Sequence, residues 1–266
     1  MCRHLAALLT AIAAVMTATS CGQQTILTED VTVDVLLPTT PVKDQGNSST
    51  GWIYAMLATI ETEHLLRGDS VNLSAVYVRR AITQHSDSIK ALSTASKTPS
   101  TASSAGEGAS QCQQLLSIIG KHGIVAYDQL PDDSTDDLRT PLWVFMYGMK
   151  YSPQEFAHSV CAPGEYCVFT IKGDYAIEET GTKRVPTGTL RSRIDRAAGS
   201  HPVCWEGNSH SMCIIGKAHD GNTHYYILKD SHGADAPNGG LVYMPEDELW
   251  QQARAVCLTR DAYEKQ

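Results

Sequence analysis

The spacing of apolar residues changes along this chain, and that change constrains the fold more than any other feature of the sequence. From Gly51 onward, apolar residues recur at steps of three and four, which predicts an amphipathic helix. Similar patterns follow Ser74 and cover residues 110–123 and 189–198. The last third holds five short apolar runs between turn residues, which predict strands over Tyr166–Ile171, Met212–Gly216, Tyr225–Leu228, Leu241–Met244 and Ala255–Leu258. Helices followed by strands indicate an α+β protein with two lobes.

The composition argues against a nucleic-acid partner and against a metal. The formal net charge is −8, and no run of basic residues is present that could neutralise phosphates. The eight cysteines show no CxxC or Cys/His spacing typical of a zinc site. We therefore expect no nucleic acid among the partners, and neither a metal nor an organic cofactor.

The first 21 residues are typical of an export signal. An apolar run from Leu5 to Met16 follows a short polar start and is too short to span a membrane. Residues 18–21, ATSC, are similar to a bacterial lipobox, although an ordinary cleaved signal with a chance cysteine is the alternative. We expect an exported protein anchored to a bacterial membrane by acyl chains on Cys21. The expected divisions are a signal peptide (1–21), a tether (22–36) and a folded domain (37–266).

Residues 41–55, PVKDQGNSSTGWIYA, connect a loop to the start of the first predicted helix. This segment resembles the papain family of cysteine peptidases, in which a PVKxQG sequence leads to a catalytic Cys-Trp pair. Gln45 and Trp52 have the family's separation. The resemblance gives Gln45 the oxyanion-binding role and Trp52 a place in the substrate cleft. Gly51 stands at the position of the nucleophilic cysteine.

The chemistry explains why a thiol belongs at that position and why its loss matters. A helix N-terminus favours a thiolate, and a nearby side-chain amide can stabilise the developing oxyanion. Glycine has no side chain to attack a carbonyl. Ser49 and Thr50 are displaced around the helix axis, and Cys213 is expected in a buried strand position, so none of them is expected to replace the thiol.

Two later motifs resemble the remaining catalytic segments of the family. Residues 208–216, NSHSMCIIG, resemble its histidine strand and make His210 the catalytic histidine. Residues 225–233, YYILKDSHG, resemble the strand that ends in Asn-Ser-Trp-Gly, with Asp230 in place of the asparagine and His232 in place of the tryptophan. An aspartate can still orient an imidazole, although Asp230 could instead be a turn residue that closes a strand.

Weaker matches extend the resemblance from Pro41 to Leu258. Gly106 and Gly108 resemble the glycine-bearing substrate strand of the family. Trp205 and Glu206 precede His210 and are expected to line the cleft, the alternative being a loop aromatic and a solvated acid. The spacing and the segment 152–156 are similar to the bleomycin-hydrolase-like branch.

The resemblance implies a papain-like fold with a helical N-terminal lobe, an antiparallel β-rich C-terminal lobe and a cleft between them. In active members the thiolate attacks the peptide carbonyl and the histidine protonates the leaving amine. Three functions remain open for this chain. It could bind a peptide or protein ligand without catalysis, act as a peptidase through another nucleophile or in a parent with Cys at position 51, or serve as a structural or assembly lipoprotein.

Overall fold

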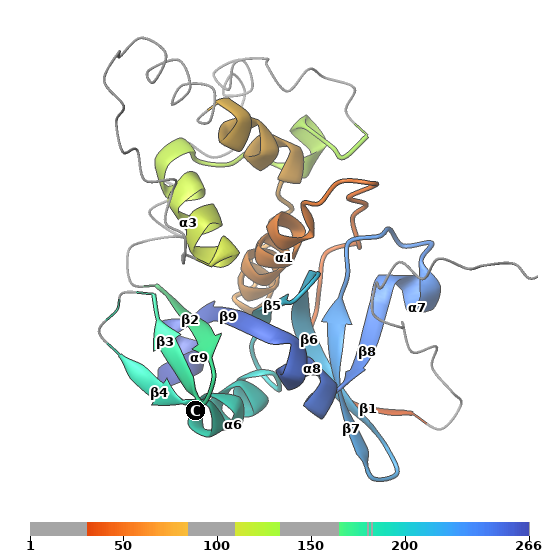
Figure 1. Cartoon of the computed structure of the whole chain (residues 1–266). Helices are drawn as coiled ribbons and strands as arrows, with labels where there is room; N and C mark the ends of the chain where they lie inside the picture. Colours follow the sequence, from red (N-terminus) through yellow and green to blue (C-terminus); the bar gives the residue numbers. More distant parts are fainter. Residues whose placement is uncertain (1–30, 85–109, 134–164, 180, 182, 266) are drawn as a thin grey trace, which may run out of the picture.

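One large antiparallel sheet dominates the part of the chain that the structure describes. A computed structural model describes residues 31–84, 110–133, 165–179, 181 and 183–265 (Figure 1). Within these residues the strand order is β4-β3-β2-β9-β5-β6-β7-β8, and β1 pairs with β6. The strands are β1 (Thr32–Leu36), β2 (Tyr166–Lys172), β3 (Tyr175–Glu178), β4 (Arg184–Pro186), β5 (Val203–Gly207), β6 (Ser211–Asp220), β7 (Thr223–Lys229), β8 (Leu241–Pro245) and β9 (Ala253–Thr259).

Helices from the first half of the chain form a separate lobe against this sheet (Figure 1). They are α1 (Gly51–Leu66), an unlabelled helix described over residues 75–84, α3 (Gln111–His122) and the 3-10 turn η1 (Tyr127–Gln129). Ser110 caps α3 by accepting a hydrogen bond from the Gln113 N–H, and the helix ends at Gly123. Ser74 caps the 75–84 helix in the same way through the Tyr77 N–H. These caps confirm the predicted starts of both helices.

The sheet has an apolar core on each face. On one face, helices α6 (Thr187–Ala197), α8 (Glu246–Gln252) and α9 (Arg260–Glu264) pack against strand residues that include Phe169, Trp205 and Leu258. On the other face, α1 packs against the sheet through residues such as Ala58, beside Cys213. α1 also contributes Ile53, Met56 and Leu57 to a second core, which the other helices of the lobe share with strands β2, β5 and β9. A short turn of helix, α7 (Pro237–Gly240), connects β7 to β8.

The five predicted strands are all present, and the sheet also contains strands that the sequence analysis did not predict. These are β1, β3, β4 and β5. The tether expected over residues 22–36 ends earlier, because Thr32–Leu36 pair with β6 and belong to the sheet. The helix signal at 152–156 lies outside the described residues. None of the described helices is long and apolar enough to cross a membrane.

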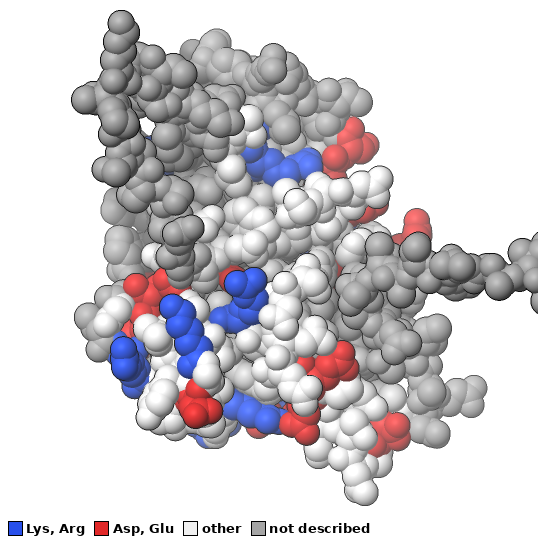
Figure 2. All heavy atoms as spheres, viewed as in Figure 1, with Lys and Arg blue, Asp and Glu red and all other residues white. Residues whose placement is uncertain are grey.

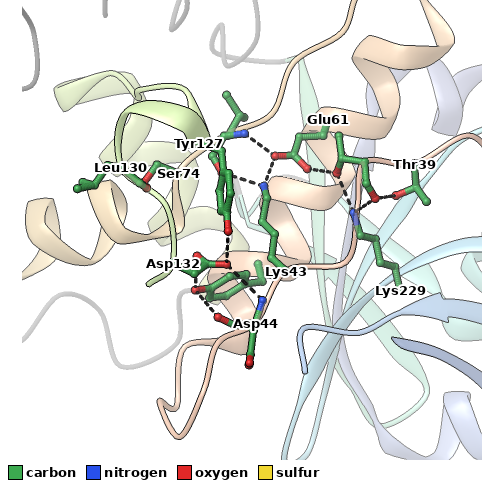
Figure 3. A network of polar contacts seen from close by, with 12 residues as sticks. Thr39, Lys43, Asp44, Glu61, Ser74, Tyr127, Leu130, Asp132 and Lys229 are labelled. Carbon is green, nitrogen blue, oxygen red and sulfur yellow. Dashed lines mark hydrogen bonds and ion pairs between the residues drawn. The ribbon is translucent and has the colours of Figure 1, made fainter. Parts of the chain in front are cut away.

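A buried polar network fixes the loop that precedes α1 (Figure 3). Glu61 of α1 pairs with the Lys43 ammonium and accepts hydrogen bonds from the Leu73 N–H (2.6 Å) and the Thr40 hydroxyl (2.5 Å). Lys229, at the end of β7, donates to both oxygens of Thr40 at 2.8 Å. Burial lowers the pKa of Lys229 to about 8, although the charge of Glu61 opposes that shift. The network therefore connects the helical lobe, the loop and the sheet.

Candidate active site

The N-terminus of α1 opens onto a cleft of about 560 Å³ between the helices and the sheet. The helical side of the cleft is lined by Gln45, Ser49, Gly51, Trp52, Ser110 and Gln111. The sheet side is lined by residues 170–172, 206–211, 254 and 255. Two of the sheet-side residues, Lys172 and Arg254, are exposed cations. The cleft thus contains the loop and helix start of the first motif and the segment before β6 that carries His210.

His210 and Asp230 face each other from the two strands that the motifs predicted. His210 immediately precedes β6, and Asp230 immediately follows β7. The Nε2 atom of His210 lies 2.6 Å from Oδ1 of Asp230. On the other carboxylate oxygen, Oδ2, the Nδ1 atom of His232 lies at 2.7 Å. One buried carboxylate therefore holds two imidazole rings, whose centroids are 5.3 Å apart.

The surroundings of Asp230 keep its carboxylate ionised. Burial by itself raises the pKa of Asp230, but hydrogen bonds from His210, His232 and the Ser231 N–H outweigh burial and lower the pKa to about 2. The Asp230 side chain is only 3% exposed, whereas that of His232 is 37% exposed. His232 therefore lies on the open side of the carboxylate.

Gln45 is held beside the start of α1 by a short pairing between two distant segments. Asp44 and His232 form an antiparallel bridge, and the Gln45 N–H donates to the Ser231 carbonyl at 2.8 Å. The side-chain oxygen of Gln45 accepts a hydrogen bond from the Ser231 hydroxyl (2.6 Å), and its Nε2 donates to the Ser48 carbonyl (2.8 Å). The amide expected at the oxyanion position therefore lies in the cleft, with both ends hydrogen-bonded to the protein.

The His210 ring and the Gln45 amide occupy the space that a side chain at position 51 would need. A Cβ atom built on Gly51 would lie 2.6 Å from Cε1 of His210, 3.0 Å from its Nδ1 and 2.7 Å from Oε1 of Gln45. Contacts this short require the neighbours to move. The space beside position 51 is thus closed to a larger side chain unless these neighbours move, which the sequence alone could not reveal.

The sequence analysis considered three other nucleophiles, which are Ser49, Thr50 and Cys213. Thr50 is bonded through its hydroxyl to Ser48 at 2.6 Å. Ser49 lines the cleft, but within the described residues no hydrogen bond joins it to His210. Cys213 is fully buried on β6, and burial raises the pKa of its thiol to about 12. Within the described residues, none of these three side chains is hydrogen-bonded to His210.

The two residues expected next to His210 have different positions. Trp205 is 1% exposed in the core beneath α8 and donates from its ring nitrogen to the Leu249 carbonyl, so the expectation that it lines the cleft is wrong. Glu206 does line the cleft, where its carboxylate accepts a hydrogen bond from the Cys112 N–H in the first turn of α3 (2.6 Å). Trp52 also lines the cleft. The proposed substrate positions Gly106 and Gly108 lie outside the described residues.

Sequence reasoning did not assign a role to Ser231 or to the cations of β2 and β9. Ser231 contacts Gln45 because it stands between Asp230 and His232 in a turn that pairs with the loop before α1. Lys172 and Arg254 belong to paired strands, in which Thr170 is opposite Ala255. Residues two positions apart in an extended chain point to the same side, as Asp230 and His232 do. This spacing is the sequence signal that could have predicted that the two side chains lie together.

Comparison with known proteins supports the fold at low sequence similarity. No protein-family model matches this chain, and no curated protein matches it. Among solved structures, the digestive procathepsin L 3 of the Tenebrio molitor larval midgut matches at 16% identity and a TM-score of 0.53, over 83% of this chain and 66% of that one. A structure from work on the mite allergens Blo t 1 and Der p 1 matches at 14% identity and a TM-score of 0.50, over 92% and 73% of the two chains.

These neighbours define the class of the fold. They are papain-like cysteine peptidases, and the described chain combines helices with a large antiparallel sheet, which matches their α+β fold. The chain therefore has the papain-like α+β fold. It spans about two thirds of the length of the procathepsin chain that it matches.

Proposed function

We propose that this protein is a non-catalytic papain-fold lipoprotein that binds a peptide or protein ligand in its cleft. The observation that carries the proposal is the pairing of an intact frame with a missing nucleophile. Gln45, His210 and Asp230 lie around the start of α1, yet Gly51 offers no side chain and its Cβ position is filled by His210. The resemblance to the bleomycin-hydrolase-like branch is part of the same proposal.

The lining of the cleft favours a ligand with several polar groups. Lys172 and Arg254 offer exposed cations on the sheet side, and Trp52 offers an aromatic surface on the helical side. Glu206 is already bonded to the start of α3, which leaves the two cations as the exposed charges of that wall. A peptide that carries an acidic side chain suits this combination.

Peptide binding without turnover is the expected behaviour of the full chain. A mixed peptide library would be incubated with the protein, and the bound and free fractions would be analysed by mass spectrometry. We expect captured peptides with intact bonds, and capture reduced by about tenfold in Arg254→Glu, because a favourable charge contact becomes repulsive. Lys121→Glu is the matched control, since Lys121 is an exposed cation at the far end of α3.

The outcomes separate the three candidate functions. Peptide cleavage by the parent that disappears in His210→Ala would establish a peptidase with another nucleophile and overturn the proposal. Capture that is equal in the parent, Arg254→Glu and Lys121→Glu would move binding away from the cleft and favour a structural or assembly role.

We also propose export and anchoring through a lipid on Cys21, with no nucleic-acid partner. The signal-like segment and the cysteine at position 21 support the anchor. Figure 2 shows acidic and basic side chains interspersed on the visible face without an extended basic surface, which supports the absence of a nucleic-acid partner. Radiolabelled palmitate should be incorporated by the parent in a bacterial host and should be absent from Cys21→Ala. Equal labelling of both proteins would refute lipidation at this cysteine.

A further inference from the structure

Three side chains that commonly bind metals converge beside the cleft. They are His210, Asp230 and His232, and their nearest donor atoms all lie within 4.8 Å of one another. Among the described residues, this is the group of three or more His, Cys, Asp or Glu side chains whose donor atoms lie this close together. Two imidazoles and one carboxylate form a ligand set that zinc and other divalent transition metals accept.

The departures from the papain-like sequence pattern account for two of the three donors. Asp230 stands where the pattern has asparagine, and His232 stands where it has tryptophan. Each departure introduces a metal-binding side chain, and both new side chains lie next to His210. The same site has lost its thiol at position 51. Relative to the papain-like pattern, these three differences remove a nucleophile and add two metal-binding side chains.

The present distances are close to those a metal needs. Two ligands on a tetrahedral zinc ion lie about 3.3 Å apart, because each Zn–N or Zn–O bond is about 2.0–2.1 Å long. Here Nε2 of His210 and Nδ1 of His232 lie 2.6 and 2.7 Å from the Asp230 oxygens, and every donor separation is below 4.8 Å. Small rotations of the two rings would make room for an ion between the nitrogens and the carboxylate.

The site also has a fixed ligand and access from solvent. Asp230 is held by the Ser231 N–H (2.8 Å) in addition to the two rings, so its carboxylate is positioned before any ion arrives. His232 is 37% exposed and His210 is 18% exposed, which leaves one side open. His210 also lines the cleft, so unfilled coordination positions would face a cleft ligand.

From this geometry we infer that His210, Asp230 and His232 form a binding site for one divalent transition-metal ion, with zinc as the best match. Three protein ligands would leave at least one coordination position for water or for a carboxylate of a cleft ligand. This inference does not depend on peptide binding, and it differs from the sequence-based expectation of no metal. The signal missed in the sequence was the D-x-H spacing directly after a strand.

Isothermal titration calorimetry of the full chain with Zn²⁺ tests the site. We expect one ion per chain, and binding weakened by about tenfold or more in both Asp230→Asn and His232→Phe. His219→Phe is the matched control, because His219 and Asp34 form an exposed pair at 2.8 Å that, within the described residues, belongs to no cluster of three potential ligands. That variant should bind zinc as the parent does.

Spectra of the Co²⁺-loaded parent distinguish this site from binding by cysteines. Nitrogen and oxygen ligands give visible bands, whereas a cobalt–thiolate bond adds a charge-transfer band in the near ultraviolet. We expect the visible bands without the near-ultraviolet band. Circular dichroism of each variant verifies folding, and the exposure of His232 makes its replacement mild for stability. Absence of stoichiometric zinc binding, a thiolate band, or equal affinities in the parent and both ligand variants would each overturn the inference.

Discussion

The Gly51→Cys protein is expected to cleave peptides that the parent leaves intact, with a rate at least about 10²-fold above the parent. A thiol at position 51 would stand at the N-terminus of α1, where the helix dipole favours the thiolate. Nδ1 of His210 lies 3.0 Å from the Cβ position, so the sulfur would have an imidazole beside it. Asp230 holds the opposite nitrogen of that ring, which is the arrangement needed for an acid–base histidine.

The new side chain must first displace the groups that now fill its place. The closest atoms are the edge of the His210 ring at 2.6 Å and the amide oxygen of Gln45 at 2.7 Å. Both belong to side chains, so rotation can relieve the contacts without moving the backbone. Rotation of Gln45 would also free its amide from Ser48 and Ser231, and this freedom is what an oxyanion contact needs.

Two assays test the Gly51→Cys variant: hydrolysis of a fluorogenic peptide measures cleavage, and alkylation measures the reactivity of the new thiol. Gly51→Ala is the matched control because it introduces the same Cβ without a nucleophile, and it should remain inactive. A folded Gly51→Cys protein with a reactive thiol but no hydrolysis would contradict the view that only one side chain is missing. Activity that appears only after adding Asp230→Asn and His232→Trp would assign the remaining defect to the altered strand end.

Glu61→Ala should lower the free energy of unfolding by about 3–5 kcal/mol, because it removes one partner of a buried ion pair and leaves the other charge uncompensated. Glu61 is 1% exposed and is bonded to Lys43, to the Leu73 N–H and to the Thr40 hydroxyl (Figure 3). Lys43 would keep only the Leu73 carbonyl, at 2.8 Å, as a described hydrogen-bond partner. The backbone N–H of Leu73 would lose its acceptor as well.

Urea denaturation of the parent, Glu61→Ala, Lys43→Met and the double variant measures this effect as a cycle. We expect the double variant to lose less unfolding free energy than the two single variants lose in sum, because it removes both buried charges together. Arg191→Ala is a useful comparison, since its ion pair with Asp247 is on the surface and should contribute less than about 1 kcal/mol. A loss below about 1 kcal/mol for Glu61→Ala would show that water reaches Lys43 readily.

The sequence predicts those parts of the fold whose signals are local. Ser110 and Gly123 bound α3 because capping is decided by a few neighbouring residues. Strand β5, Val203–Gly207, escaped prediction because it is only five residues long and ends in a glutamate and a glycine, two residue types that are depleted in strands. Its alternation is nevertheless regular, with Trp205 in the core beneath α8 while Glu206 faces the cleft. Burial of Glu206 depends on α3, which is distant in sequence.

The candidate site follows the same division between local and distant signals. The positions of Gln45, Gly51 and His210 could be inferred because each lies in a recognisable segment at the start of a helix or strand. The closure of position 51 by His210 depends on the packing of two segments about 160 residues apart, so no local pattern encodes it. The contact of Asp230 with both His210 and His232 likewise depends on the folded structure, because β6 and β7 bring His210 beside the turn after β7.

The double membership of α1 limits how the cleft can move. Its residues belong both to the core that it shares with the other helices and with β2, β5 and β9 and to the core that it forms with β6, β7 and β8, and its two buried acids contact different partners. Glu61 contacts the loop and Leu73, whereas Glu63 contacts His201 and Thr259 beside the sheet. A hinge rotation of one lobe would therefore pull α1 from one of its cores. We therefore expect adjustments of the cleft to come from its side chains rather than from a hinge rotation between the lobes.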